Sequence, residues 1–185
     1  MDRLLDSDES LMGRVTLGNR EALEVLIRRH ATPLLLFIQR MVGDRHLGED
    51  LFQEVFLAIW RKRNRYGSGR PFKPWLYAIA LNQCRAAFRR QRSAAPLSLD
   101  DEHLACVAAG RAPLETAIAG ETAALVAHAV TLLPPQQRAV VVLRLWQQLS
   151  YAEIAGVLDC TQATVRSHMH LGLCTLRKYL EPRMQ

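Results

Sequence analysis

One long stretch of this sequence has no acidic residue. Residues 61–92 contain no Asp or Glu but hold ten Arg or Lys. The flanking parts are slightly acidic, because residues 1–60 carry seven basic residues against ten acidic ones, and residues 93–185 carry seven against eight. The net charge of +6 therefore comes entirely from one segment. Such a concentration of one sign is typical of a surface that binds nucleic acid, and the alternative is a solvated basic helix.

Long hydrophobic runs are also absent. No run approaches the roughly 20 apolar residues that cross a membrane, and the acidic start MDRLLDSDES does not have the pattern of a secretory signal. The apolar fraction of 49% is ordinary for a folded protein. We therefore expect a soluble, cytoplasmic chain that forms one compact domain or two small ones.

The four cysteines show no CxxC spacing, so they are predicted to be free thiols. Two His–Cys pairs, His103 with Cys106 and His170 with Cys174, could each form half of a zinc site. No second half has suitable spacing for either pair. The sequence also lacks a nucleophile motif and a phosphate-binding loop. We therefore predict no metal, no cofactor and no enzymatic activity.

Aromatic residues are interleaved with the basic stretch. Aromatic faces beside cations suit unstacked bases, where one stack contributes roughly 1–3 kcal/mol; the alternative is that these rings belong to the core. The Gly/Ser loop RYGSGR precedes Pro71, where a new helix is predicted to start. On that helix, four polar residues share one outward face. The aromatic residues of the basic stretch are Tyr66, Phe72, Trp75, Tyr77 and Phe88. The four outward residues of the predicted helix are Asn82, Arg85, Arg89 and Arg92.

Two helices are predicted before the basic stretch. Apolar residues recur at helical spacing over residues 8–41, with Asn19 as a cap and with Pro33 expected to kink or break the helix. Residues 46–64 form a second apolar stripe. Off that stripe lies an acidic face with one apolar neighbour, which reads either as a solvated surface or as a docking surface for a basic partner. Its residues are Asp50, Gln53, Glu54 and Leu57.

Residues 93–113 differ from the segments on either side. They contain two prolines and an acidic run, so they are predicted to be an extended, flexible linker between two domains. A helix is predicted over 114–132, and Pro134-Pro135 ends it and starts the next one.

A helix-turn-helix is predicted further on. Ser150 and Glu153 form a capping box that opens a short helix. Three further residues have the spacing of a helix-turn-helix: a small residue where the two helices touch, Ala155; a turn residue, Asp159; and an apolar residue that anchors the second helix, Val165. The second helix is predicted to begin after a threonine cap at 161 and to run to about 179. A helix-turn-helix places its second helix in the DNA major groove. An ordinary helical hairpin is the alternative.

Two stretches together resemble extracytoplasmic-function (ECF) sigma factors of bacterial RNA polymerase. GDRHLGEDLFQEVFLAIWRK with FKPWLYAIALNQCRAAFRR looks like sigma region 2, and LLPPQQRAVVVLRLWQQLSYAEIAGVLDCTQATVRSH looks like region 4. The resemblance covers residues 10–92 and 114–180. It implies an all-α fold of two small helical domains: a region 2 bundle at 1–92, the flexible linker at 93–113, and a region 4 helix-turn-helix domain at 114–185.

The resemblance also implies roles for individual residues. The acidic face would dock on the coiled-coil of the largest polymerase subunit, through Asp50, Gln53, Glu54 and Phe56. The loop and the basic helix would capture and melt the −10 element, through Asn64, Arg65, Arg70, Trp75, Asn82, Arg85, Arg89 and Arg90. The helix-turn-helix would read the −35 element, through Ser150, Tyr151, Thr161, Thr164, Arg166, Ser167, His168 and His170.

The function implied is promoter-specific transcription initiation. The implied partners are core RNA polymerase (its largest-subunit coiled-coil and its flap), promoter DNA and an anti-sigma factor, without a small-molecule substrate. The sequence departs from the family pattern at Ala86, Leu81, Leu171 and Leu173, where charged residues are usual. Two alternatives stay open: a stand-alone helix-turn-helix repressor, and an interaction protein without promoter function.

Overall fold

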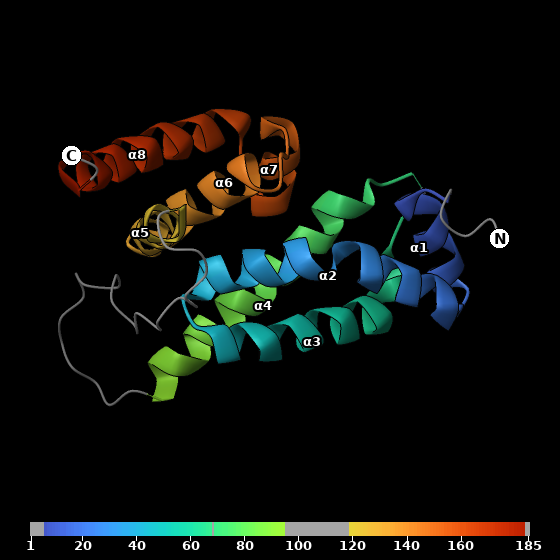
Figure 1. The fold of residues 1–185 in the computed structure, drawn as a ribbon. Helices are drawn as coiled ribbons and strands as arrows, with labels where there is room; N and C mark the ends of the chain where they lie inside the picture. Colours follow the sequence, from blue (N-terminus) through green and yellow to red (C-terminus); the bar gives the residue numbers. More distant parts are fainter. Residues whose placement is uncertain (1–5, 68, 95–118, 184–185) are drawn as a thin grey trace.

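The computed structural model describes residues 6–67, 69–94 and 119–183, and this part of the chain is helical without a β-strand. Most of the predicted linker, residues 95–113, and the first residues of the helix predicted over 114–132 lie outside the described residues. The all-α class with two helical domains is confirmed (Figure 1). The elements are α1 Asp8–Thr16, α2 Arg20–Val42, α3 Arg45–Lys62, η1 Arg63–Arg65, α4 Phe72–Ala94, α5 Ala119–Thr131, α6 Pro135–Leu145, α7 Tyr151–Leu158, α8 Gln162–Leu180 and η2 Glu181–Arg183.

The N-terminal domain consists of α1 to α4, with α2 packed against the other three. The helical span predicted over 8–41 consists of two helices: Gly18 has a left-handed φ of 90°, and the predicted cap Asn19 starts α2 by accepting a hydrogen bond from the Ala22 amide. Pro33 lies inside α2 and does not end it. At the far end, Gly43 closes α2 with a φ of 74°, and the Asp44 side chain caps α3.

Helix α1 ties α2 to the beginning of α4. Asp8 accepts from Arg29 at 2.9 Å and lies 2.6 Å from His30 Nε2, and both of these partners belong to α2. Glu9 accepts a hydrogen bond from the Phe72 amide at 3.0 Å, which satisfies a free backbone N–H at the start of α4. These contacts fix the angle at which α4 leaves the preceding loop.

The aromatic residues of the basic stretch belong mainly to the core. Phe72, Trp75 and Tyr77 are buried, and Tyr66 packs edge-on against Trp75 with 5.0 Å between ring centroids. The Tyr66 hydroxyl donates to the Arg70 carbonyl, and burial, followed by the charge of Glu9, raises the pKa of Tyr66 to about 12. The prediction that these four rings are free to stack on bases is therefore wrong; they hold the loop before α4 in place.

The C-terminal domain consists of α5 to α8 and contains the predicted helix-turn-helix. Ser150 and Glu153 form the predicted capping box around the start of α7. Asp159 makes the turn with a left-handed φ of 55°, and Thr161 caps α8 by accepting from the Thr164 amide at 3.1 Å. Gly172 lets α8 approach α6 closely, since a Cβ there would lie 2.8 Å from Val141 Cγ2.

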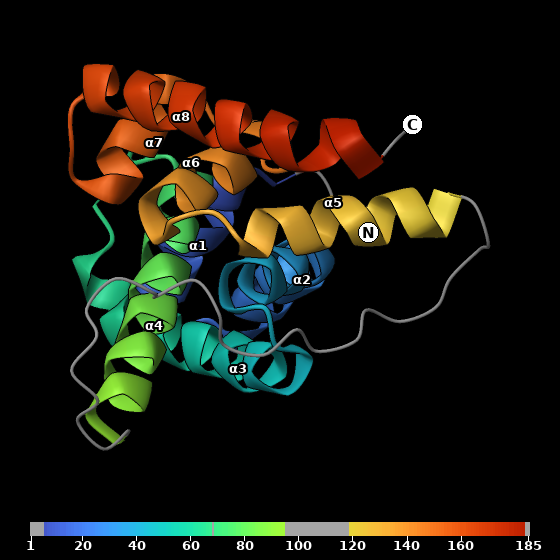
Figure 2. The ribbon, with the colours of Figure 1, turned by 90° about the vertical axis from the view of Figure 1, so that its left-hand side faces the viewer.

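The two domains are docked against each other. Helices α5 and α6 pack on α2, and α7 packs on α4, as the second view makes plain (Figure 2). Helices α3 and α8 lie on opposite outer sides of the molecule in both views. The docked arrangement therefore leaves the outer sides of these two helices away from the domain interface.

Candidate partner and nucleic-acid interfaces

The outer side of α3 carries the predicted acidic face. Asp50, Gln53 and Glu54 are exposed, and Leu57 beside them is 47% exposed. Phe56, predicted to be part of this face, is only 8% exposed and packs edge-on against Phe52 at 5.1 Å. It therefore supports α3 from beneath, because an apolar ring at that position of the stripe is drawn into the core.

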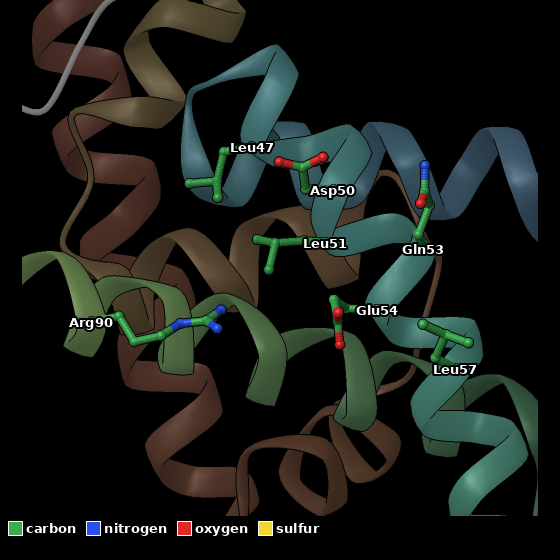
Figure 3. Close-up of a pocket in the computed structure, with 7 residues that line it drawn as sticks. All are labelled: Leu47, Asp50, Leu51, Gln53, Glu54, Leu57 and Arg90. Atoms are coloured by element: carbon green, nitrogen blue, oxygen red, sulfur yellow. The ribbon is translucent and has the colours of Figure 1, made fainter.

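An open pocket of about 370 Å³ is hollowed beside this face. Arg90 of α4 reaches into it towards Leu51 and Glu54 (Figure 3). The structure thus separates Arg90 from the outward residues of α4 and places it with the acidic face, because it lies a quarter-turn or more around the helix from Arg89. The pocket is lined by Leu47, Asp50, Leu51, Gln53, Glu54, Leu57 and Arg90.

A basic stripe, defined by Asn82, Arg85 and Arg89, runs along α4. Asn82 and Arg89 are exposed, whereas Arg85 is half-buried and its Nη2 donates to Gln136 Oε1 of the other domain at 3.4 Å. The Arg92 side chain, predicted to extend the stripe, lies outside the described residues. The structure thus confirms the outward orientation of Asn82 and Arg89 and shows that Arg85 contacts α6.

The loop before α4 presents further basic groups. Asn64, Arg65 and Arg70 are exposed around the aromatic cluster. Trp75, expected at the DNA, is only 6% exposed and lies between the rings of Tyr66 and Phe72. Trp75 therefore cannot stack on a base in this conformation, and any effect on DNA binding is indirect, through the loop that it supports.

The outer face of α8 is the candidate reading surface of the helix-turn-helix. His168 is half-buried, and its Nδ1 is enclosed without a hydrogen-bond partner among the described residues. Tyr151 of α7 lies under two guanidinium groups, those of Arg144 at 5.2 Å and Arg166 at 5.8 Å. The exposed members of the predicted set are Ser150, Thr161, Thr164, Arg166, Ser167 and His170.

Sequence reasoning missed two apolar residues of these surfaces. Leu47 lines the α3 pocket, and Leu171 is 50% exposed on the outer face of α8. Leu171 stands one helical turn after Ser167, so it shares that residue's face. The available signal was a leucine at a helix position that shares the face of polar residues.

The cysteines that the structure describes are free thiols, as predicted. Cys84 is buried, and burial raises its pKa to about 12, so it is an inert thiol. Cys174 is exposed, with its Sγ 3.7 Å from His170 Nε2, while His103 and Cys106 lie outside the described residues. The described ranges contain no cluster of three metal-ligating residues. Nor does any helix within them have the length and apolar character needed to cross a membrane.

A basic helix beside an acidic surface, with a helix-turn-helix in the second domain, is the combination expected of a DNA-binding protein that also has a protein partner. Comparison with known families agrees: residues 26–94 match Sigma-70 region 2, and residues 123–176 match Sigma-70, region 4. The chain is 35% identical to the RNA polymerase sigma factor CarQ of Myxococcus xanthus, over 91% of this chain and 95% of that protein. It is 27% identical to the ECF RNA polymerase sigma factor SigW of Bacillus subtilis, over 90% and 93%.

The chain belongs to the ECF family of RNA polymerase sigma factors, which are transcription initiation factors. Its fold is similar to that of CnrH, solved in complex with the cytosolic domain of CnrY, with a TM-score of 0.73 at 24% identity, covering 96% of this chain and 99% of that one. The Bartonella quintana sigma factor RpoE, solved in complex with the anti-sigma factor NepR, gives a TM-score of 0.69 at 19% identity over 85% and 96%. At these identities the likeness concerns the fold.

Proposed function

We propose that this chain binds core RNA polymerase through the outer face of α3. Asp50 and Glu54 are exposed there, with Gln53 between them and Leu57 alongside. Two carboxylates next to an exposed leucine offer both charge complementarity and apolar area to a basic helical partner. The largest-subunit coiled-coil of core polymerase is the partner that the family resemblance implies.

The −10 element is recognised by the loop before α4 together with the basic stripe. Exposed Arg65, Arg70 and Arg89 supply cations for phosphates, while Asn64 and Asn82 supply amides suited to base edges. Arg85 joins them once it leaves its contact with Gln136. Trp75 holds the loop from within the core, and exposed Arg90, which lines the α3 pocket, adds a further cation at the edge of this surface.

The −35 element is recognised by α8 in the major groove. Thr164, Ser167 and His170 lie on its exposed side and can donate and accept hydrogen bonds, and Arg166 adds the charged contact. Ser150, Tyr151, Thr161 and His168 surround this face: Ser150 and Thr161 cap the two helices, and Tyr151 supports Arg166. Recognition here depends more on hydrogen bonds than on charge.

The domain assignment follows from these roles. Residues 1–92 carry core docking and −10 recognition, residues 114–185 carry −35 recognition and the contact with the polymerase flap, and residues 93–113 join them. The protein acts in the cytoplasm, where its polymerase and promoters are, and has no catalytic activity of its own. An anti-sigma factor, the partner that the resemblance implies, regulates it.

The observation that carries this proposal is the separation of opposite charges on one bundle. A repressor needs a basic surface for DNA but has no use for the acidic α3 face. A sigma factor needs both, because it must hold a basic protein and an acidic nucleic acid at the same time. In this chain the acidic face lies on α3 and the basic stripe on α4.

Reversing the charge of Asp50 and Glu54 to lysine tests the proposal. The fold should survive, because exposed substitutions usually change stability by no more than about 0.5 kcal/mol each. Co-purification with core polymerase and run-off transcription should both be lost, because the basic docking surface would meet like charge. Circular dichroism checks folding.

The matched control is Glu24→Lys with Glu181→Lys, which changes the net charge equally at two exposed sites that form surface ion pairs with Arg28 and Arg177. The control should keep core binding. A double variant at Asp50 and Glu54 that still binds core and initiates normally would show that this face is solvated. If the wild type protects promoter duplex equally well without core, the protein is a repressor.

A further inference from the structure

We infer that Glu9 of α1 is a positioning residue for −10 recognition. Its carboxylate holds the loop before α4 in the conformation that presents Asn64, Arg65 and Arg70 to DNA. The inference rests on the proposed sigma-factor function and adds to it a residue from outside the stretch that matches Sigma-70 region 2, which begins at residue 26. Helix α1 packs on η1 and α4 as well as on α2 (Figure 1).

Glu9 caps a helix to which it does not belong. The first backbone N–H groups of a helix have no partner within that helix. Phe72 is the first residue of α4, and its amide donates to Glu9 Oε1 at 3.0 Å, across 63 positions of the chain. A carboxylate at this end is also favoured by the positive end of the helix dipole. The contact therefore fixes where α4 begins.

A second contact holds the loop from within. The Tyr66 hydroxyl donates to the Arg70 carbonyl, and the Tyr66 ring packs edge-on against Trp75. Arg70 thus has its carbonyl bound to the loop while its side chain is exposed, and it stands two residues before Phe72. A shift of the Phe72 backbone would therefore move the Arg70 cation.

Helix α1 is itself anchored firmly enough to position the loop. Asp8, the neighbour of Glu9, pairs with Arg29 at 2.9 Å and lies 2.6 Å from His30 Nε2, both on α2. The His30 ring in turn lies 5.3 Å from the Phe72 ring. The buried residues of α1 are Leu11, Met12 and Val15. Glu9 is therefore held in place from both sides of the α2–α4 contact.

The charge of Glu9 argues that it acts through the loop and not on DNA directly. A carboxylate near a surface that binds phosphates repels the nucleic acid. Removing the charge alone should therefore strengthen binding, whereas removing the hydrogen bond to the Phe72 amide should weaken it. The two effects have opposite signs, so they can be separated by experiment.

Glu9→Met and Glu9→Gln form a matched pair for this test. Both side chains are neutral and unbranched and have similar helix propensities, but only glutamine keeps an oxygen that can accept from the Phe72 amide. The measurement is binding of the holoenzyme to a single-stranded oligonucleotide that carries the non-template −10 sequence of the promoter used for run-off transcription.

Glu9→Gln should bind this strand at least as tightly as the wild type. Glu9→Met should bind it about fivefold more weakly than Glu9→Gln, which is the size of effect expected when a helix cap is lost. The apparent affinity falls because the loop is in its binding conformation for a smaller fraction of the time. If Glu9→Met does not fold, Glu9→Ala takes its place in the same comparison.

Two further measurements are controls. Both variants should co-purify with core polymerase, and their holoenzymes should bind a duplex that carries only the −35 element as the wild type does, because Glu9 belongs to the other domain. Circular dichroism should show equal helix content in the three proteins. A selective loss on the −10 strand is an effect that general destabilisation would not produce.

Two results would overturn the positioning role: equal affinity of the methionine and glutamine variants for the −10 strand, or equal losses on the −10 strand and the −35 duplex. Failure of the proposed function would be visible in the wild type itself. A wild-type holoenzyme that binds the −10 strand no better than a scrambled strand would refute the −10 role of the loop and, with it, the role of Glu9.

Discussion

The two domains present very different surfaces to DNA. The N-terminal domain combines the basic stripe of α4 with exposed arginines in the preceding loop. The outer face of α8 in the C-terminal domain carries mostly hydroxyl, imidazole and apolar groups, with Arg166 at its side. Phosphate contacts provide affinity and base contacts provide specificity. The difference therefore suggests that the N-terminal domain supplies most of the salt-dependent binding and that α8 supplies mainly discrimination.

Their cores differ as well. The N-terminal core contains several large rings, among them Phe37, Phe72 and Tyr77, which enclose the start of α4. The C-terminal core is built from smaller aliphatic side chains, such as the consecutive buried residues Val140, Val141 and Val142, and from a close approach of α8 to α6 at Gly172. The N-terminal core should therefore lose most stability when an aromatic ring is removed. The C-terminal core should lose most stability when a methyl group is added.

The largest effect is expected from Trp75→Ala. Removing a buried tryptophan costs about 3–5 kcal/mol, so the free energy of unfolding should fall by that amount in chemical denaturation followed by circular dichroism. If Trp75 instead served as an exposed platform for a base, the free protein would keep its stability and only promoter melting would suffer. That result would contradict the core assignment of the N-terminal rings.

A smaller loss is expected from Gly172→Ala. The new methyl group would lie 2.8 Å from Val141 Cγ2, and Val141 is fully buried, so either α8 or the Val141 side chain must shift. Overpacking of this kind costs about 1–3 kcal/mol. Thermal unfolding should show a lower midpoint.

Gly156→Ala is the matched control on α7, where no atom lies within 4 Å of the added Cβ. Alanine should stabilise that helix by about 0.5–1 kcal/mol. Equal effects at the two glycines would show that α6 and α8 are not in close contact.

The smallest effect separates the two DNA surfaces. Arg85→Ala and Arg89→Ala should each reduce the log–log salt slope of promoter-complex formation by about 0.9, the release expected for one phosphate contact. Arg166→Ala should change sequence preference more than slope, if it reads a base edge. Binding of the complete holoenzyme to promoter DNA at several salt concentrations measures both quantities. Unchanged slopes in the two α4 variants would show that the basic stripe does not contact DNA phosphates.

Local features of this fold could be predicted from the sequence. The caps at Asn19, Ser150 and Thr161 are found where they were expected, because each depends on a side chain and backbone only a few residues away. The acidic face and the basic stripe were also predictable from helical periodicity. Sigma-factor membership followed from two motifs in order.

The sequence alone thus determined the helices, their caps, the separation of charge and the family. Only the tertiary structure decided which residues of each helix meet other elements. It placed Trp75 and Phe56 in the core, moved Arg90 to the α3 pocket, and brought Gln147 to Tyr77 across 70 positions of the chain. Periodicity tells which side of a helix is buried, but not what lies against it. The partner of a buried polar group depends on how distant helices pack, and so it is determined only when the whole chain has folded.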